Sequence, residues 1–164
     1  MKDFYKTYFD EYFQLIYPEN IDLQLEEFKK LALKAKESDN KLMFAGNGAS
    51  ASMSAHGAVD FTKQGGVRAV TFNEANIITC FVNDFGYDHW VSEAVKFYGK
   101  KNDVLVLISV SGESPSVVNA AKFAKEKDMQ VVTFSGRHST NTLRSLGDIN
   151  FWVDSHAYNI VECI

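Results

Sequence analysis

The loop Ser109–Ser114 has the residue types of a site that binds an anion. It contains three serines and one glycine, and it follows the apolar run Val104 to Ile108. The serines are Ser109, Ser111 and Ser114. Ser114 followed by Pro115 is typical of a helix start, where free amides and the helix dipole attract negative charge. Hydroxyls and amides without a cation would suit a phosphate monoester; a turn that only caps a helix is an equally good interpretation of this loop alone.

A second donor-rich loop, Gly46–Ala51, follows the apolar run Lys41 to Ala45. It formally fits the glycine fingerprint of dinucleotide-binding proteins. That fingerprint needs an acid at the end of the next strand, and the candidate Glu74 comes later, beyond that strand. Two donor-rich loops at neighbouring strand ends favour one small phosphorylated polyol, with Asn47 supplying hydrogen bonds.

His56 and Asp60 are four residues apart in a predicted helix and therefore share one face of it. Such a pair can bind a divalent metal or perform acid–base chemistry. A contact that only stabilises the helix surface is the more common meaning of this spacing. The two donor-rich loops are what favours a functional role for the pair.

Further along, Asn83 and Asp84 are an adjacent amide and carboxylate between aromatic residues, which indicates a polar turn or a helix cap. The three remaining histidines have no partner at a useful spacing. We expect His89, His138 and His156 to be solvent or packing residues.

The elements that must position these residues alternate between strands and helices from residue 41 onward. Five short apolar or β-branched runs predict strands: Lys41 to Ala45, Ala69 to Phe72, Val104 to Ile108, Val131 to Phe134 and Ile149 to Val153. Strands separated by helical segments imply a parallel sheet covered on both faces, a three-layer α/β/α arrangement. Ligands of such sheets lie beyond the carboxyl ends of the strands.

Two helices precede the sheet. The first carries an aromatic face from Phe4 to Ile16 and ends before Pro18, and the second runs from about Asn20 to Lys36. The aromatic face must be covered, either by its own domain or by a second subunit.

Length and charge narrow the class of protein. With 164 residues and 46% apolar content, the chain is expected to form one domain, with helices in residues 1–38 and an α/β core in 41–164. The net charge of −4 argues against nucleic-acid or anionic-lipid binding, and no apolar run reaches membrane-spanning length. We expect a cytoplasmic protein.

Cys80 and Cys163 have no metal or redox spacing and are predicted to be buried thiols.

Together, these motifs resemble the sugar isomerase (SIS) domain, in particular its phosphoheptose isomerase branch. The resemblance covers about residues 41 to 162 and depends on four motifs in register. They are Gly46–Ser50, His56 with Asp60, Asn83–Tyr87 and Ile108–Ser114. It implies a five-stranded parallel flavodoxin-like sheet, a homotetramer with active sites between subunits, and conversion of sedoheptulose 7-phosphate into an aldoheptose 7-phosphate.

The resemblance also implies roles for individual residues. Ser109, Ser111 and Ser114 would hold the phosphate, with Val110 where the branch usually has threonine. Asn47, Gly48, Ala49, Asn83 and Asp84 would line the sugar. Asp60 would be the catalytic base, and His56, Asp60 and Glu162 could hold zinc.

Besides Val110, the chain departs from the branch at two places. Asp60 replaces the usual glutamate, which shortens the reach of the carboxylate by roughly 1 Å, enough to slow a proton transfer about a hundredfold. The sequence ends at Ile164, before the family's long C-terminal helix and its second acid–base histidine, and Glu162 falls at or beside a glutamine position. The expected function is therefore a phosphosugar isomerase, and the alternative is a non-catalytic SIS module that binds a sugar phosphate or a partner protein.

Overall fold

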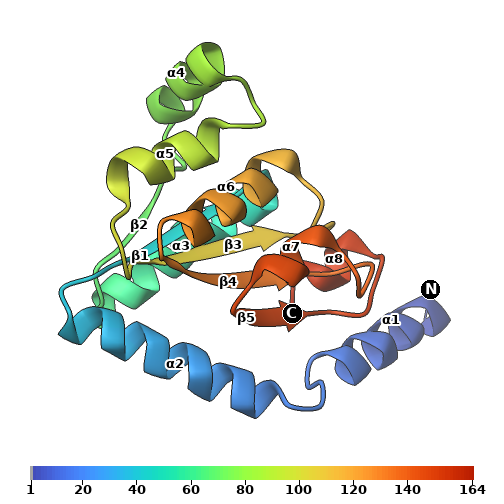
Figure 1. The fold of residues 1–164 in the computed structure, drawn as a ribbon. Helices are drawn as coiled ribbons and strands as arrows, with labels where there is room; N and C mark the ends of the chain where they lie inside the picture. Colours follow the sequence, from blue (N-terminus) through green and yellow to red (C-terminus); the bar gives the residue numbers. More distant parts are fainter. Residues whose placement is uncertain (1) are drawn as a thin grey trace.

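A computed structural model describes residues 2–164, with side chains described from Asp3 onward. Its centre is a five-stranded parallel sheet in the order β2-β1-β3-β4-β5, which is the flavodoxin-like order (Figure 1). The strands are β1 (Leu42–Gly46), β2 (Ala69–Thr71), β3 (Val104–Ser109), β4 (Gln130–Ser135) and β5 (Ile149–Trp152). All five predicted strands are confirmed, with ends that shift by one residue or not at all.

The helices of the described chain alternate with the strands after an N-terminal pair. They are α1 (Lys2–Leu15), α2 (Ile21–Glu37), α3 (Ala49–Lys63), α4 (Ala75–Phe85), α5 (Trp90–Tyr98), α6 (Pro115–Glu126), α7 (Thr142–Leu146) and α8 (Tyr158–Val161). The predicted helices before the sheet are confirmed. The sheet separates two apolar clusters, so the three-layer arrangement is confirmed as well.

Each face of the sheet has its own core. On one face, Met43 and Leu105 pack under α5, α6 and α7. On the other, Phe44 and Val106 pack under α2 and α3, where Phe28 and Ala58 close the layer. The central strands are buried along nearly their whole length, which explains why they appear in the sequence as continuous apolar runs.

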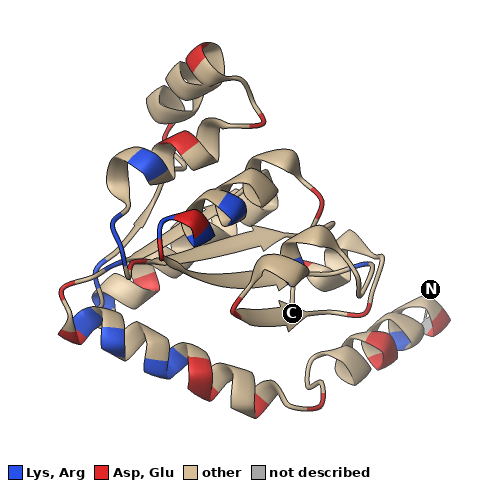
Figure 2. Ribbon diagram, viewed as in Figure 1, with Lys and Arg blue, Asp and Glu red and all other residues tan. Residues whose placement is uncertain are grey.

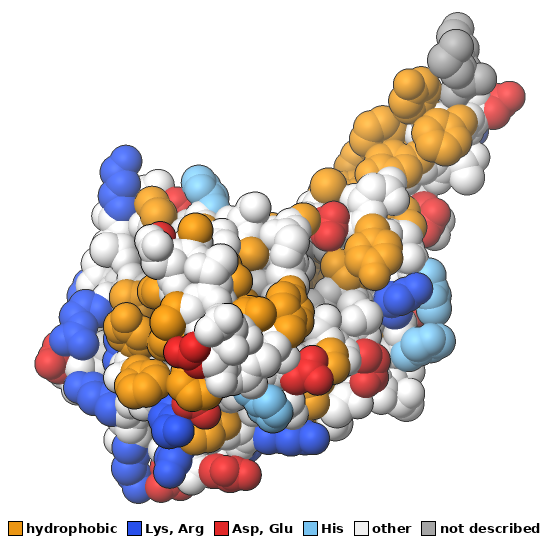
Figure 3. Space-filling model, turned by 90° about the horizontal axis from the view of Figure 1, so that it is seen from above, with side chains coloured by type: hydrophobic (Ala, Val, Ile, Leu, Met, Phe, Trp, Pro, Cys, Tyr) orange, Lys and Arg blue, Asp and Glu red, His pale blue; other side chains and the backbone are white. Residues whose placement is uncertain are grey.

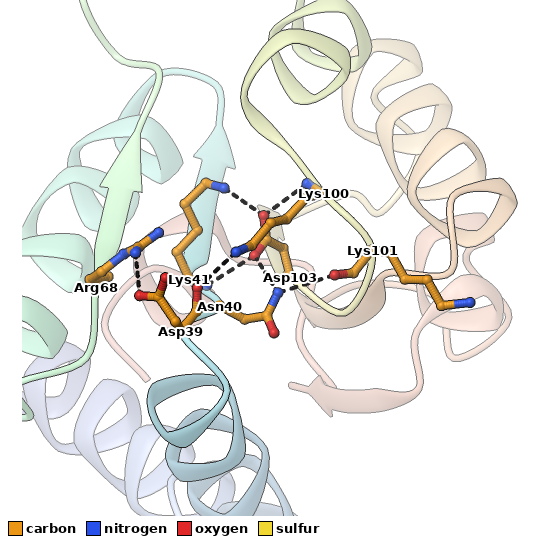
Figure 4. Close-up of polar contacts among 7 residues, drawn as sticks. All are labelled: Asp39, Asn40, Lys41, Arg68, Lys100, Lys101 and Asp103. Carbon is orange, nitrogen blue, oxygen red and sulfur yellow. Dashed lines mark hydrogen bonds and ion pairs between the residues drawn. The ribbon is translucent and has the colours of Figure 1, made fainter.

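A polar cluster fixes the amino ends of β1 and β3 (Figure 4). Asp103 is fully buried, and its carboxylate accepts hydrogen bonds from the Asn40 side chain at 3.0 Å, the Lys41 amide at 3.0 Å and the Lys100 amide at 2.9 Å. The Lys41 ammonium contacts the same carboxylate at 2.5 Å. Burial alone raises the pKa of Asp103, but these hydrogen bonds outweigh it and hold the pKa below its ordinary value.

Two predictions are wrong. The segment around Asn83 and Asp84 is the last turn of α4, and it is neither a polar turn nor a helix cap. Glu74 caps the start of this helix by accepting hydrogen bonds from the amides of Asn76 and Ile77, and the helix continues to Phe85. Cys80 and Cys163 are exposed and not buried. Cys80 lies on α4, where no residue is fully buried, so its apolar neighbours in sequence do not enclose it.

The N-terminal helix α1 projects from the body of the protein (Figures 1 and 3). Its hydrophobic side chains line the projecting arm, and Phe4 and Phe13 are each 67% exposed. The helix makes two hydrogen bonds with the C-terminal part of its own chain: the Tyr12 hydroxyl donates to the Cys163 carbonyl at 2.9 Å, and the Ser155 hydroxyl donates to a Glu11 carboxylate oxygen at 3.4 Å. None of the helices in residues 2–164 is long and apolar enough to cross a membrane.

Candidate functional site

The two loops predicted to bind one phosphorylated polyol face the same cavity at the carboxyl edge of the sheet. The cavity has a volume of about 300 Å³. Its lining comes from the glycine loop, the serine loop and helix α8: Asn47, Gly48, Ala49, Ser50, Ile108, Ser109, Val110, Ser111, Ser114, Tyr158 and Glu162. The structure thus brings together seven of the nine predicted substrate-binding residues and one predicted metal ligand, Glu162.

The serine loop holds its shape through its own hydrogen bonds. The Gly112 amide donates to the Ser109 carbonyl at 3.0 Å, and the Glu113 amide donates to the Ser111 hydroxyl at 3.2 Å. Ser114 stands at the N-cap of α6 and makes no side-chain capping bond. Its hydroxyl lies 3.4 Å from that of Ser109, so two hydroxyls and the first amides of α6 meet at the cavity.

A support for this loop, which the sequence interpretation missed, comes from the connection after β4. Gly112 has a φ of 66°, and an added Cβ would lie 2.1 Å from Oδ1 of Asn141. Asn141 is buried and donates to the carbonyl of His138 at 2.9 Å. The Leu143 amide donates to the Gly112 carbonyl at 2.9 Å. The only sequence signal was the polar run between β4 and β5, which is typical of an ordinary loop.

The glycine loop lies close against the serine loop. An added Cβ on Gly46 would lie 2.8 Å from the Ile108 carbonyl oxygen, so only glycine fits between the two strand ends. The Asn47 amide nitrogen donates to the Ser116 hydroxyl at 3.0 Å, and the Tyr87 hydroxyl donates to Asn47 Oδ1 at 3.1 Å. Asn47 is therefore held in place beside the cavity.

His56 and Asp60 pair on the outer face of α3, away from the cavity. Their Nε2 and Oδ2 atoms are 3.4 Å apart, and the side chains are 79% and 51% exposed. At 1.5 Å per residue, Asp60 lies about 16 Å along the helix from Ala49 at the cavity. Glu162 is at the cavity, and in the described chain no three His, Cys, Asp or Glu side chains group closely enough to hold a metal ion.

Asn83 and Asp84 do not line the cavity within one chain. They lie at the end of α4, where the Asn83 amide nitrogen donates to Asp84 Oδ1 at 2.8 Å, and both residues are exposed. Their predicted contact with the sugar remains a prediction.

A second, apolar cavity of about 450 Å³ adjoins the first. Ser50, Ile108, Val110 and Glu162 belong to both, while the second cavity continues between α2, α3 and β5, with Phe28 and Phe61 in its wall. The polar cavity therefore has an apolar neighbour at the same edge of the sheet.

His138 and His156, expected to be solvent or packing residues, pack against each other. Their ring centroids are 4.8 Å apart in an edge-to-face arrangement. They come from the connections after β4 and β5, which parallel strands bring to one edge, so spacing along the chain could not indicate the contact.

The fold and the cavity define a class: a flavodoxin-like α/β protein with a donor-rich serine loop at the topological switch point of its sheet. Comparison with known proteins identifies the family. The SIS domain model matches residues 5–136. The phosphoheptose isomerase of Buchnera aphidicola subsp. Schizaphis graminum is 31% identical over 144 residues, which are 83% of this chain and 74% of that protein. The chain belongs to the SIS domain family.

Other relatives support the assignment to this family. The phosphoheptose isomerase of Helicobacter pylori is 32% identical over 143 residues, covering 84% of this chain and 74% of that protein. The structure of the phosphoheptose isomerase GmhA from Neisseria gonorrhoeae superposes with a TM-score of 0.80 at 31% identity, covering 88% of this chain and 79% of that one. A phosphoheptose isomerase structure from Francisella tularensis, 21% identical, has a TM-score of 0.84 over 98% of this chain and 89% of that one, and supports the fold.

Proposed function

We propose that the protein is a phosphosugar isomerase that converts sedoheptulose 7-phosphate into D-glycero-D-manno-heptose 7-phosphate through an enediolate. The observation that carries the proposal is the cavity where the serine loop and the glycine loop meet. Its hydroxyls and helix amides suit a phosphate group, and the relatives that are 31% and 32% identical to this chain are phosphoheptose isomerases.

The reaction needs three functions from the protein. A phosphate anchor fixes the substrate, a base removes the proton alpha to the carbonyl, and hydrogen-bond donors stabilise the enediolate oxygen. Ser109, Ser111 and Ser114 are the anchor. Asn47 lines the cavity and is held by Tyr87 and Ser116, and its second amide hydrogen would donate to a sugar oxygen. The proton removed from C1 returns to C2, and the hydroxyl proton of O1 passes to O2, so the isomerisation is proton-neutral and the base ends the cycle unchanged.

The base that we assign, Asp60, does not line the cavity of its own chain and lies eleven residues along α3 from Ala49, which does. An extended seven-carbon sugar phosphate is shorter than the roughly 16 Å along α3 between Ala49 and Asp60. We therefore propose that the site combines the loops of one subunit with Asp60 of another. The exposed aromatic face of α1 supports an oligomer, which we expect to be a homotetramer.

Zinc remains a prediction, which metal analysis of the purified protein tests. His56 and Asp60 give two donors, and Glu162 does not join them within one chain, so the described residues do not fit the three protein ligands of a catalytic zinc site. No step of the proposed mechanism is assigned to a metal.

The test is to incubate the purified protein with sedoheptulose 7-phosphate and to follow the aldose product by NMR. We expect product from the unmodified chain and none from the double variant Ser111→Ala, Ser114→Ala. Binding of the sugar phosphate with neither turnover nor exchange of its alpha proton would overturn the proposal and leave a binding module.

A further inference from the structure

Arg137 is the only lysine or arginine in the five connections that lead from a strand to the next helix. These connections form the carboxyl edge of the sheet, where the cavity lies. Figure 2 shows that most other Lys and Arg lie on α2, on α5 and α6, and around the amino ends of the strands. A site for a phosphate dianion therefore has one cationic side chain in the loops beside it.

The backbone of Arg137 is held in an unfavourable conformation. Its φ is 57°, and the other non-glycine residues with positive φ in residues 2–164 are all Asn or Asp, which tolerate this region. The Arg137 amide donates to the Ser155 carbonyl at 2.9 Å, and this bond fixes the conformation. Strain of this kind persists where the surrounding structure imposes it, and it gathers at functional sites.

The side chain of Arg137 connects to the cavity through Tyr158. The guanidinium carbon lies 5.5 Å from the centre of the Tyr158 ring, and Tyr158 lines the same cavity as the serine loop. The Gly136 amide, one residue earlier, donates to the Val110 carbonyl at 3.0 Å, which attaches this turn to the serine loop. Nε of Arg137 is buried and has no hydrogen-bond partner among the described residues. Such a buried donor requires a partner.

We propose that Arg137 is a binding residue for the phosphate group of the substrate. Tyr158 holds its guanidinium beside the serine loop by a cation–π contact, and the anion gives the guanidinium the partner that the protein does not provide. This inference deepens the proposed function and rests on it. It adds a cation to a site that the sequence describes as hydroxyls and amides alone.

Arg144 offers a matched control. It is the other arginine near this edge, and its guanidinium stacks 4.6 Å from the centre of the Trp152 ring. Its Nη1 donates to the Ser139 carbonyl at 2.8 Å. Because its partners are in the protein, replacing it removes the same unit of charge without removing a ligand contact.

The experiment is calorimetric titration of the full chain with sedoheptulose 7-phosphate, using Arg137→Gln, Arg137→Gly and Arg144→Gln. We expect both Arg137 variants to weaken binding at least about tenfold, as loss of a charge-assisted bond does, and Arg144→Gln to stay within about twofold. The loss should shrink in about 0.5 M salt, where screening reduces the attraction between charges. A purely structural role would not produce this salt dependence.

Arg137→Gly separates binding from folding. Glycine adopts positive φ without strain, so this variant should unfold at the same temperature as the parent or higher while binding more weakly. Binding by both Arg137 variants within about twofold of the parent would overturn the inference and leave the isomerase proposal intact. A parent chain that binds the sugar phosphate without converting it would overturn the isomerase proposal alone, and a parent that binds none would overturn both.

Discussion

The carboxylate of Glu113 accepts two hydrogen bonds from Thr142, one from its backbone amide and one from its hydroxyl, each at 2.7 Å. This contact, with the bond from the Leu143 amide to the Gly112 carbonyl, joins the serine loop after β3 to the start of α7 after β4. The carboxylate of Glu113 is therefore hydrogen-bonded to the first residue of α7. In this way the connection after β4 fixes the shape of the serine loop after β3.

The first prediction concerns this contact. Glu113→Gln keeps the shape but lacks one acceptor oxygen, so it should weaken sugar-phosphate binding by about fivefold, which corresponds to about 1 kcal/mol for one hydrogen bond. Thr142→Ser keeps both donors and should bind like the parent, whereas Thr142→Val loses the hydroxyl and should resemble Glu113→Gln. Calorimetric titration measures all three, and equal affinities would show that the loop keeps its shape without the contact.

The same contact predicts a pH dependence. The hydrogen bonds from Thr142, with a smaller contribution from the charge of His138, hold the pKa of Glu113 below its usual range. A lowered pKa in the folded state contributes stability that is present above the ordinary glutamate value of about 4.3 and is lost as the pH falls through the folded value. Thermal unfolding between about pH 3 and 6 should therefore show a smaller loss of stability at low pH for Glu113→Gln than for the parent.

The second prediction concerns the hydroxyls of the serine loop. Ser111→Ala with Ser114→Ala should weaken sugar-phosphate binding by at least about 2 kcal/mol, from two charge-assisted hydrogen bonds of roughly 1 kcal/mol each. The fold should be little affected, since neither hydroxyl caps α6. Unchanged affinity in calorimetric titration would exclude the loop from the site.

The sequence predicted the sheet and the two loops because both are local patterns. Each strand is a continuous apolar run, and parallel strands bring their carboxyl ends to one edge, so Asn47 and Ser111 were expected to meet there. The supports that hold the site, Asn141 under Gly112 and Thr142 beside Glu113, are far apart from their partners in sequence and belong to residue types common in any loop. No spacing rule indicates them.

The wrong predictions have the same origin. Asn83 and Asp84 were assigned to a polar turn or a helix cap because they stand between aromatic residues, but the helix that begins after the cap at Glu74 continues through them to Phe85. The pairing of His56 and Asp60 was correct, yet their distance from the serine loop depends on how far α3 extends from the cavity. The cavity of one chain therefore contains the proposed phosphate-binding loop and does not contain the proposed base.

The third prediction concerns stability at the opposite edge of the sheet. Asp103→Asn leaves the Lys41 ammonium, whose side chain is 14% exposed, without its partner and should lower the free energy of unfolding by about 3 kcal/mol. Asp39→Asn removes an exposed carboxylate that pairs with Arg68, and it should change the free energy of unfolding by less than about 1 kcal/mol. Urea unfolding followed by circular dichroism measures the free energy of unfolding of both variants. Equal losses would show that the contribution of Asp103 to stability does not depend on its burial.

The fourth prediction concerns assembly. Deleting residues 1–17 removes the aromatic face of α1, on which Phe9 is 50% exposed, and should lower the oligomeric state seen by light scattering. A milder variant, Phe9→Ser with Phe13→Ser, should act in the same direction. Replacing the exposed Lys29 of α2 by Gln is a control that should leave the assembly unchanged. An unchanged mass in both α1 variants would show that α1 packs only on its own domain.

The last prediction tests Asp60 as the base. If Asp60 removes the alpha proton, solvent deuterium enters the substrate at that carbon, and NMR detects this exchange even where net turnover is slow. Asp60→Asn keeps the shape and removes the basicity, so it should abolish exchange while leaving sugar-phosphate affinity within about tenfold. Full exchange by this variant would show that another group takes the proton.

Mixing variants then locates the base in the assembly. Chains carrying Asp60→Asn and chains carrying Ser111→Ala with Ser114→Ala are each inactive, and co-expression brings both into one oligomer. If each site takes its loop from one chain and Asp60 from its neighbour, random pairing restores about one quarter of the sites, because half of the pairs are mixed and each mixed pair has one intact site. If each chain used its own Asp60, no site would contain both an intact loop and an intact base, and no exchange would return. Restored exchange would therefore explain how a carboxylate roughly 16 Å along α3 from its own cavity takes part in catalysis.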